Sequence, residues 1–277
     1  MTPVLVDIGA NLAHDSFDHD RDAVLARARA AGVAAMIVTG STLDDTEKAI
    51  SLCRNHPRTL RATAGVHPHH AVGLRDGDAG RLSALLADPM VVAAGECGLD
   101  YFRNFSPPAE QRRAFELQLG LAERHAKPLF LHQRDAHADL VAMLRAHPQA
   151  LSRAVLHCFT GGASELDDCL ALGLSVGITG WICDERRGQA LREAAARVPR
   201  DRLMLETDAP YLLPRTIQPK PPHRRNEPAF LPEVLRETAR CRGEDPHALA
   251  EATSANARRF FGLTLRPNDG GGAAELV

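Results

Sequence analysis

The segment KPLFLHQRDA, residues 127–136, shows the pattern from which the fold can be predicted. Its run Pro128–His132 is apolar until His132 closes it, and a stretch of helical character follows. A short run that is apolar on both faces is typical of a parallel strand covered by helices. The segment therefore predicts a buried strand that ends in an imidazole.

Seven further runs of this kind alternate with amphipathic stretches along the chain. They are Val4–Ile8, Val33–Thr39, Leu60–Val66, Val91–Glu96, Ala154–Phe159, Leu174–Thr179 and Leu203–Asp208. About eight strand–helix units in succession predict an α/β fold of the (β/α)8 TIM-barrel type. A doubly wound open sheet is the alternative that this pattern leaves open.

The length and composition agree with one large domain. The chain has 277 residues, of which 44% are hydrophobic, and barrels of this size are commonly undivided. We expect a single domain over residues 1–265 and a disordered tail over residues 266–277, which contains the run Gly270–Gly272. The formal net charge of −2 argues against general coating of nucleic acid, although a local basic site stays possible.

Cysteine use and the N-terminus bear on where the protein resides. The six cysteines form no C-x-x-C pair, which favours reduced thiols over a disulfide scaffold. The opening residues MTPVLVDIGANL carry no basic region before their apolar run, and no uncharged stretch is long enough to span a membrane. We therefore expect a cytoplasmic protein with no membrane association and no obligate protein partner.

Polar side chains close four of the predicted strands: Glu96, His132, His157 and Asp208. The active site of a (β/α)8 barrel forms at the C-terminal ends of its strands, so the fold would bring these side chains to one rim. Imidazole and carboxylate ligands on separate strands suit a catalytic metal. A single histidine or glutamate at a strand end is more often a packing or capping residue, and the coincidence of four is what favours a metal hydrolase.

Three further residues near these positions are candidates. Glu206 falls on the same face as Asp208, one layer deeper, where it could hold a ligand in place. His67 and His69 fall on one face at the end of the third strand, within GVHPHH, and either could bind metal, contact a phosphate or cap the helix that Pro68 starts.

Basic residues gather after the strand ends, as a phosphodiester substrate would require. They are Arg103, Arg134, Arg186, Arg187, Arg215, Lys220, Arg224 and Arg225. The candidate phosphate-binding residues among them are Arg134, Arg186, Arg224 and Arg225. The aromatic residues Tyr101, Phe102 and Phe105 could stack on a base, with packing under the rim as the alternative for at least one.

The motifs that contain these residues resemble the TatD family of metal-dependent nucleases from Val6 to Gly262. In order, they are DIGANL, GVHPHH, GECGLDYFRNFS, KPLFLHQRDA, VLHCFTGG, GITGWICDERRG, LETDAPYLLPR and RRNEPAFLP. A complete series in order is very specific. The resemblance implies a magnesium-dependent DNase that degrades single-stranded DNA or RNA from the 3′ end, with a role in DNA repair or turnover.

The resemblance also assigns roles by position. Glu96, His132 and His157 match the family's metal ligands, and Asp208 matches the acidic residue that binds metal or activates water. We therefore expect Glu96 and Asp208 to be catalytic. The resemblance implies Mg²⁺ or Mn²⁺ for activity. Two histidine ligands favour zinc or manganese over magnesium, so we expect that Zn²⁺ can also be bound.

One pair of positions departs from many family members, which carry a His-x-His pair that builds a first metal site. Here the pair is Gly9 and Asn11, after Asp7. We expect one tight ion, with Asp7, Asn11, His67 and Glu206 as outer residues or ligands of a weak second ion.

Two other functions stay open at this point. A barrel of this kind could instead hydrolyse the ester of a D-aminoacyl-tRNA. A binding module without turnover is the other alternative, and the intact set of four metal-site residues argues against it.

Overall fold

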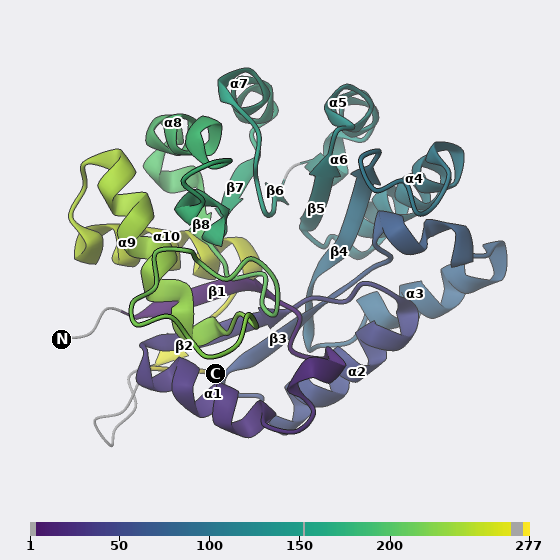
Figure 1. Ribbon diagram of the computed structural model, residues 1–277. Coiled ribbons are helices and arrows are strands. Elements are labelled where there is room, and N and C mark those ends of the chain that lie inside the picture. Colours follow the sequence, from purple (N-terminus) through teal and green to yellow (C-terminus); the bar gives the residue numbers. More distant parts are fainter. Residues whose placement is uncertain (1–3, 152, 267–273) are drawn as a thin grey trace.

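Eight parallel strands pair in the order in which they occur along the chain (Figure 1). This computed structural model describes residues 4–151, 153–266 and 274–277. The strands are β1 Leu5–Ala10, β2 Val33–Val38, β3 Leu60–Ala64, β4 Val91–Asp100, β5 Leu129–Arg134, β6 Ala154–Leu156, β7 Ser175–Ile178 and β8 Leu203–Leu205. A parallel bridge between Ala10 and Ala209 joins the end of the sheet to its beginning. The sheet is therefore closed, which confirms the predicted barrel and excludes the open sheet.

Helices follow one another around the outside of the strands (Figure 1). They are α1 Arg21–Ala30, α2 Leu43–Asn55, α3 Ala79–Leu86, α4 Pro108–His125, α5 His137–Ala146, α6 Pro148–Leu151, α7 Ala163–Ala171, α8 Gln189–Arg197, α9 Leu231–Arg242 and α10 Pro246–Phe261. Short 3-10 helices are η1 Asp15–Phe17, η2 Pro68–Gly73, η3 Asp76–Asp78, η4 Gly180–Cys183, η5 Arg200–Arg202 and η6 Pro228–Phe230. In the described part of the chain, no helix combines the length and the apolar character needed to cross a membrane.

Residues alternate between the barrel interior and the helix layer. Val6 and Ile8 of β1 contribute to the cluster that fills the barrel, together with Phe130 of β5. Leu5, between the helices and the sheet, belongs to the outer cluster. This alternation follows from the two-residue repeat of a strand, and it leaves the interior apolar below the mouth.

Three strands end three or more residues away from the end that the sequence predicted, and the other five end within two residues of it. β6 and β8 stop after three residues, so His157 and Asp208 lie in the segments that follow them. β4 instead continues four residues beyond Glu96, because a register shift against β5 lets pairing resume at Cys97. Glu96 therefore sits at an irregularity inside the strand and not at its end.

The expected disordered tail is wrong for the parts of it that the structure describes. Leu265–Arg266 (β9) pairs with Glu275–Leu276 (β10) in an antiparallel ribbon, while residues 267–273 lie outside the described residues. The Leu276 N–H donates to the Arg58 carbonyl at 2.7 Å, and the Leu276 side chain is 3% exposed. Leu276 packs with the cluster that fills the barrel. The C-terminus thus returns to the barrel.

We predict that Leu276→Ala lowers the free energy of unfolding by about 2 kcal/mol, because it removes buried apolar volume from this cluster. Val277→Ala is the matched control, since the Val277 side chain is 61% exposed. Urea denaturation of both variants measures the difference. Equal stability of the two variants would show that the C-terminal strand does not contribute to the core.

Candidate metal centre

Three histidines surround one carboxylate oxygen at the barrel mouth. Glu96 Oε1 lies 3.0 Å from His132 Nδ1, 2.7 Å from His157 Nε2 and 3.3 Å from His67 Nε2. These residues belong to four neighbouring strands or the segments after them, from β3 to β6. Imidazole nitrogens and a carboxylate oxygen gathered this closely fit a divalent metal ion. The predicted meeting of Glu96, His132 and His157 is therefore what the structure shows.

Each of the two predicted histidine ligands contacts a carboxylate through its second ring nitrogen. His132 Nε2 lies 3.3 Å from Asp100 Oδ2, and His157 Nδ1 lies 3.2 Å from Glu206 Oε2. A metal-ligating histidine typically donates its second N–H to such a partner, which fixes the ring and directs the other nitrogen at the metal. His132 Nδ1 and His157 Nε2 are thus oriented as ligands, and Glu206 has the outer position predicted for it.

His67 is oriented differently, although it forms with Glu96 and His132 a group of possible ligand atoms that lie within 4.8 Å of one another, a group that does not include His157. The His67 Nδ1 accepts a hydrogen bond from the His69 N–H at 3.0 Å. Burial lowers the pKa of His67 to about 4 and outweighs the neighbouring Glu96 carboxylate, so the ring is neutral. A neutral ring that accepts at Nδ1 carries its proton on Nε2. In this arrangement His67 therefore directs an N–H toward Glu96.

Charges in this cluster stabilise one another. Burial by itself raises the pKa of Glu96, but His157, His67 and His132 hold that pKa well below its usual range. Burial by itself lowers the pKa of His157, and the carboxylates of Glu96 and Glu206 hold that pKa well above its usual range. The buried carboxylate of Glu96 is therefore ionised and available to a cation.

Asp208 follows β8 and lies beside this cluster. Among the described residues, its one side-chain hydrogen bond comes from Asn11 Nδ2 to Oδ1, at 3.0 Å. Burial raises the pKa of Asp208 to about 7; His157 opposes this rise, and the carboxylates of Glu96 and Glu206 add to it. A carboxyl group with a pKa near neutrality can accept a proton from water. The hydrogen bond from Asn11 thus fixes the orientation of the Asp208 carboxyl.

Glu206 occupies the centre of the barrel between two glycines. A Cβ atom added at Gly9 would lie 2.5 Å from Glu206 Oε2, and one added at Gly177 would lie 2.5 Å from Glu206 Oε1. Neither position has room for a side chain while Glu206 holds His157. A larger residue at position 9 would therefore require Glu206 to move.

Asp7 is held by hydrogen bonds within the protein, and its expected part as an outer residue or in a weak metal site stays a prediction. Its carboxyl accepts hydrogen bonds from Thr207 Oγ1 at 2.5 Å, from the Thr207 N–H at 3.0 Å and from the Gly9 N–H at 3.2 Å. The group is fully buried, and burial raises its pKa to about 7. Asp7 thus joins β1 to the segment after β8.

The sequence interpretation missed Asp100, which contacts both His132 and the candidate His69. Asp100 Oδ2 lies 2.7 Å from His69 Nε2 as well as 3.3 Å from His132 Nε2. The other Asp100 oxygen accepts from the Arg103 N–H at 2.7 Å, and the residue is 1% exposed. A signal was present, because Glu96 and Asp100 share a strand face if the strand continues past Glu96.

The predicted phosphate-binding arginines divide into two groups. The Arg134 guanidinium lies 4.0 Å above the Phe102 ring and has no acidic partner among the described residues. The side chains of Arg186 and Arg224 are exposed. These three are available to a substrate.

Arg225 is a correction to the prediction. Its guanidinium bonds to both carboxylate oxygens of Asp20 at 2.8 and 2.7 Å and to the Ser16 carbonyl at 2.6 Å. Only 14% of the side chain is exposed, because these partners enclose it. Arg225 ties two loops together. Among the other basic residues, Arg187 and Arg215 both pair with Asp184.

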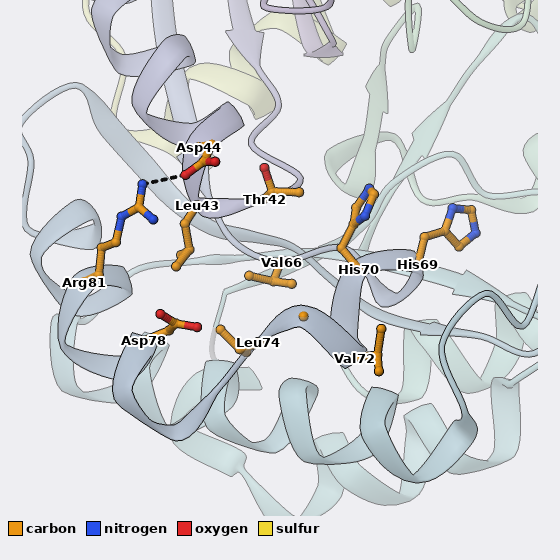
Figure 2. Close-up of a pocket in the computed structure, with 11 residues that line it drawn as sticks. Thr42, Leu43, Asp44, Val66, His69, His70, Val72, Leu74, Asp78 and Arg81 are labelled. Carbon is orange, nitrogen blue, oxygen red and sulfur yellow. Dashed lines mark hydrogen bonds and ion pairs between the residues drawn. The ribbon is translucent and has the colours of Figure 1, made fainter.

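A pocket of about 380 Å³ lies next to the metal cluster, between α2, η2 and α3 (Figure 2). Its lining residues include Val66, Leu74, Asp44 and Asp78. Arg81, which also lines it, donates to Asp44 at 2.7 Å, so this cation is already paired. With two carboxylates and a paired cation in its lining, the pocket is a poor site for a phosphate.

A closed barrel whose strand ends gather imidazole and carboxylate ligands in this way defines a hydrolase of the metal-dependent type. The family model described as TatD related DNase matches residues 6–262. The chain therefore belongs to the TatD related DNase family, which confirms the resemblance seen in its motifs.

Individual relatives cover nearly the whole chain. A protein from Erwinia amylovora named 3′-5′ ssDNA/RNA exonuclease TatD is 52% identical, over 94% of this chain and 100% of its own length. A protein of the same name from Edwardsiella piscicida is 54% identical with the same coverage. The crystal structure of YjjV, a TatD homologue from Escherichia coli, has a TM-score of 0.87 at 29% identity and covers 95% of this chain and 100% of that one.

We predict that Asp100→Asn weakens metal binding about 10- to 100-fold, since the amide no longer fixes the His132 ring through a charge. Titration calorimetry of the metal-free protein with Mn²⁺ measures the dissociation constant. The control is Asp139→Asn. Asp139 lies in α5, and its carboxylate accepts a hydrogen bond at 2.7 Å from the hydroxyl of Tyr101, the residue after Asp100. The same dissociation constant in Asp100→Asn and in the control would remove Asp100 from the metal centre.

Placing a histidine at position 9 is expected to weaken metal binding. In Gly9→His the new side chain displaces Glu206, so His157 loses its support, and we predict weaker binding of a single ion and no second one. Gly80→His is the control, because a Cβ at Gly80 meets no atom within 4 Å. Calorimetry gives the stoichiometry. Two tight ions per chain in Gly9→His would contradict the packing argument.

Proposed function

We propose that this chain is a 3′-to-5′ exonuclease that hydrolyses phosphodiester bonds in single-stranded DNA and RNA. The observation that carries the proposal is the Glu96, His132 and His157 cluster with Asp208 beside it, held by Asn11. The two relatives described above, which are 52% and 54% identical to this chain, are both named 3′-5′ ssDNA/RNA exonucleases.

Glu96, His132 and His157 would hold the metal, through the atoms that face one another in the cluster. When bound, a divalent ion supplies Lewis acidity to a phosphoryl oxygen and favours ionisation of water. The histidine-rich donor set supports Mn²⁺ or Zn²⁺ as well as Mg²⁺. Asp100 and Glu206 keep the two rings in place, and His67 steadies the Glu96 carboxylate by donating to it.

Asp208 would act as the general base. It takes a proton from the attacking water, for which a pKa of about 7 is suited because the carboxylate is both available and basic near neutral pH. Asn11 donates to Oδ1 and so presents the other oxygen to the water. Arg134, Arg186 and Arg224 carry the cations that hold the substrate phosphates and offset charge in the transition state.

The remaining sequence expectations belong to this proposal. Reduced thiols agree with a cytoplasmic location, and all six cysteines are free. A role in DNA repair or turnover stays a prediction, as does the absence of an obligate protein partner. The ester hydrolase alternative needs the same metal chemistry, so substrate assays distinguish the two functions.

We predict that Asp208→Asn retains bound metal but loses turnover about 100-fold or more, because an amide is a poor base. The assay incubates metal-supplemented protein with 5′-labelled single strands and reads the ladder of shortened products. Asp167→Asn, which alters an ion pair with Arg197 on the outer helices, is the control.

Two outcomes would contradict the proposal. Near-normal turnover of Asp208→Asn would exclude Asp208 as the base. Intact strands in the presence of the wild-type protein and each metal, with cleavage of a D-aminoacyl-tRNA ester instead, would favour the alternative function.

A further inference from the structure

Three phenylalanine and tyrosine rings are exposed among the described residues, and all three lie in loops at the barrel mouth. Phe102 is 54% exposed and Phe105 is 65% exposed, both in the loop after β4, and Tyr211 is 52% exposed in the segment after β8. Large apolar side chains that are exposed together at one place commonly mark a binding surface. The mouth therefore offers aromatic surface as well as metal ligands.

Phe105 lies close to the metal cluster from the β4 side. Its ring centroid is 4.8 Å from that of His69. His69 Nε2 is 2.7 Å from Asp100, which also contacts the His132 ring. Phe105 is therefore joined to a metal-ligand ring through two residues.

Tyr211 lies close to Asp208 from the β8 side. Its N–H donates to the Asp208 carbonyl at 2.9 Å, and its ring packs edge-on to His14 with centroids 6.0 Å apart. Burial and then the carboxylates of Asp208 and Glu96 raise the pKa of Tyr211, as expected for a hydroxyl near the cluster.

The two residues stand on opposite sides of the mouth. β4 and β8 are four strands apart in a closed ring of eight, and Figure 1 shows them across the barrel from each other. The neighbouring aromatic residues are less available. One face of Phe102 is covered by Arg134 at 4.0 Å, and the Tyr101 hydroxyl donates to Asp139 at 2.7 Å.

Charge differs between the two sides. The β4 side carries Arg134 over Phe102 without an acidic partner among the described residues. The charges nearest the Tyr211 hydroxyl are carboxylates, those of Asp208, Asp15 and Asp45, while the exposed Arg224 follows later in the same segment. A strand that continues through further phosphates is favoured on the first side, and a terminal nucleoside without a further phosphate on the second.

We propose that Phe105 and Tyr211 stack on the two bases that flank the scissile phosphate, with Tyr211 under the 3′-terminal base and Phe105 under the penultimate base. The inference rests on the proposed exonuclease function and adds the binding sites of the two nucleotides. Aromatic rings accept every base, because each base has a π-face, so the subsites are independent of sequence. Strand polarity is then set by the charges on the two sides.

The test uses three single strands: an unmodified strand, one with an abasic 3′-terminal nucleotide and one with an abasic penultimate nucleotide. On the unmodified strand, Phe105→Leu and Tyr211→Leu each lower kcat/KM about tenfold, within the range measured for loss of a stacked base. Tyr211→Leu has no further effect on the strand with the abasic terminus. Phe105→Leu has no further effect on the strand with the abasic penultimate nucleotide.

Two controls separate stacking from other effects. Tyr211→Phe keeps the ring and retains kcat/KM on all three strands. Val72→Ser removes an apolar side chain that is 59% exposed at the neighbouring pocket (Figure 2), and it leaves kcat/KM unchanged. A loss in Val72→Ser equal to that in Phe105→Leu would place the base in the pocket and overturn the proposal.

Binding without turnover gives a second readout. Metal-free protein is titrated with strands that carry 2-aminopurine at the terminal or the penultimate position, whose fluorescence is quenched by stacking. Tyr211→Leu should abolish quenching at the terminal position alone, and Phe105→Leu at the penultimate position alone. Equal quenching in wild type and variants, or the reversed pattern, would overturn the assignment. If the wild-type protein cleaves the strands but gives such results, the stacking proposal alone is wrong. If the wild-type protein cleaves no strand, the proposed function is wrong.

Discussion

The carboxylate of Glu96, buried at the mouth of the barrel, has to be compensated, and the arrangement of the centre follows from this constraint. Glu96 is 6% exposed, and its Oε1 meets imidazole nitrogens of His67, His132 and His157. Burying an unpaired charge is costly, so the histidines stabilise the fold as well as the site. The rings of His132 and His157 rest in turn on further carboxylates.

The same constraint explains how the barrel centre is packed. Glu206 holds His157 only because Gly9 and Gly177 leave space for its two oxygens. A side chain at position 9 and a carboxylate at position 206 compete for one volume. With Gly9 this volume is left to Glu206, which supports His157, and Asn11 donates to Asp208.

Charge at the mouth is mostly committed to the protein itself. Arg225 is enclosed by Asp20 and its neighbours, and Arg187 and Arg215 share Asp184. Only a subset of the basic residues that the sequence places near the rim can thus meet a substrate, with Arg134 closest to the aromatic surface. A count of arginines in the sequence overestimates the cationic surface, because some of them are paired with carboxylates of the protein itself.

The sequence by itself determined the barrel and the meeting of Glu96, His132 and His157. Strand patterns are local, and parallel strands necessarily bring their C-terminal ends to one rim. Tertiary structure decided the rest: the continuation of β4 that brings Asp100 to His132, the donor role of His67, and the return of Leu276 to the core. Arg225 and Asp20 are 205 residues apart, so their pairing depends on two loops whose geometry no local pattern encodes.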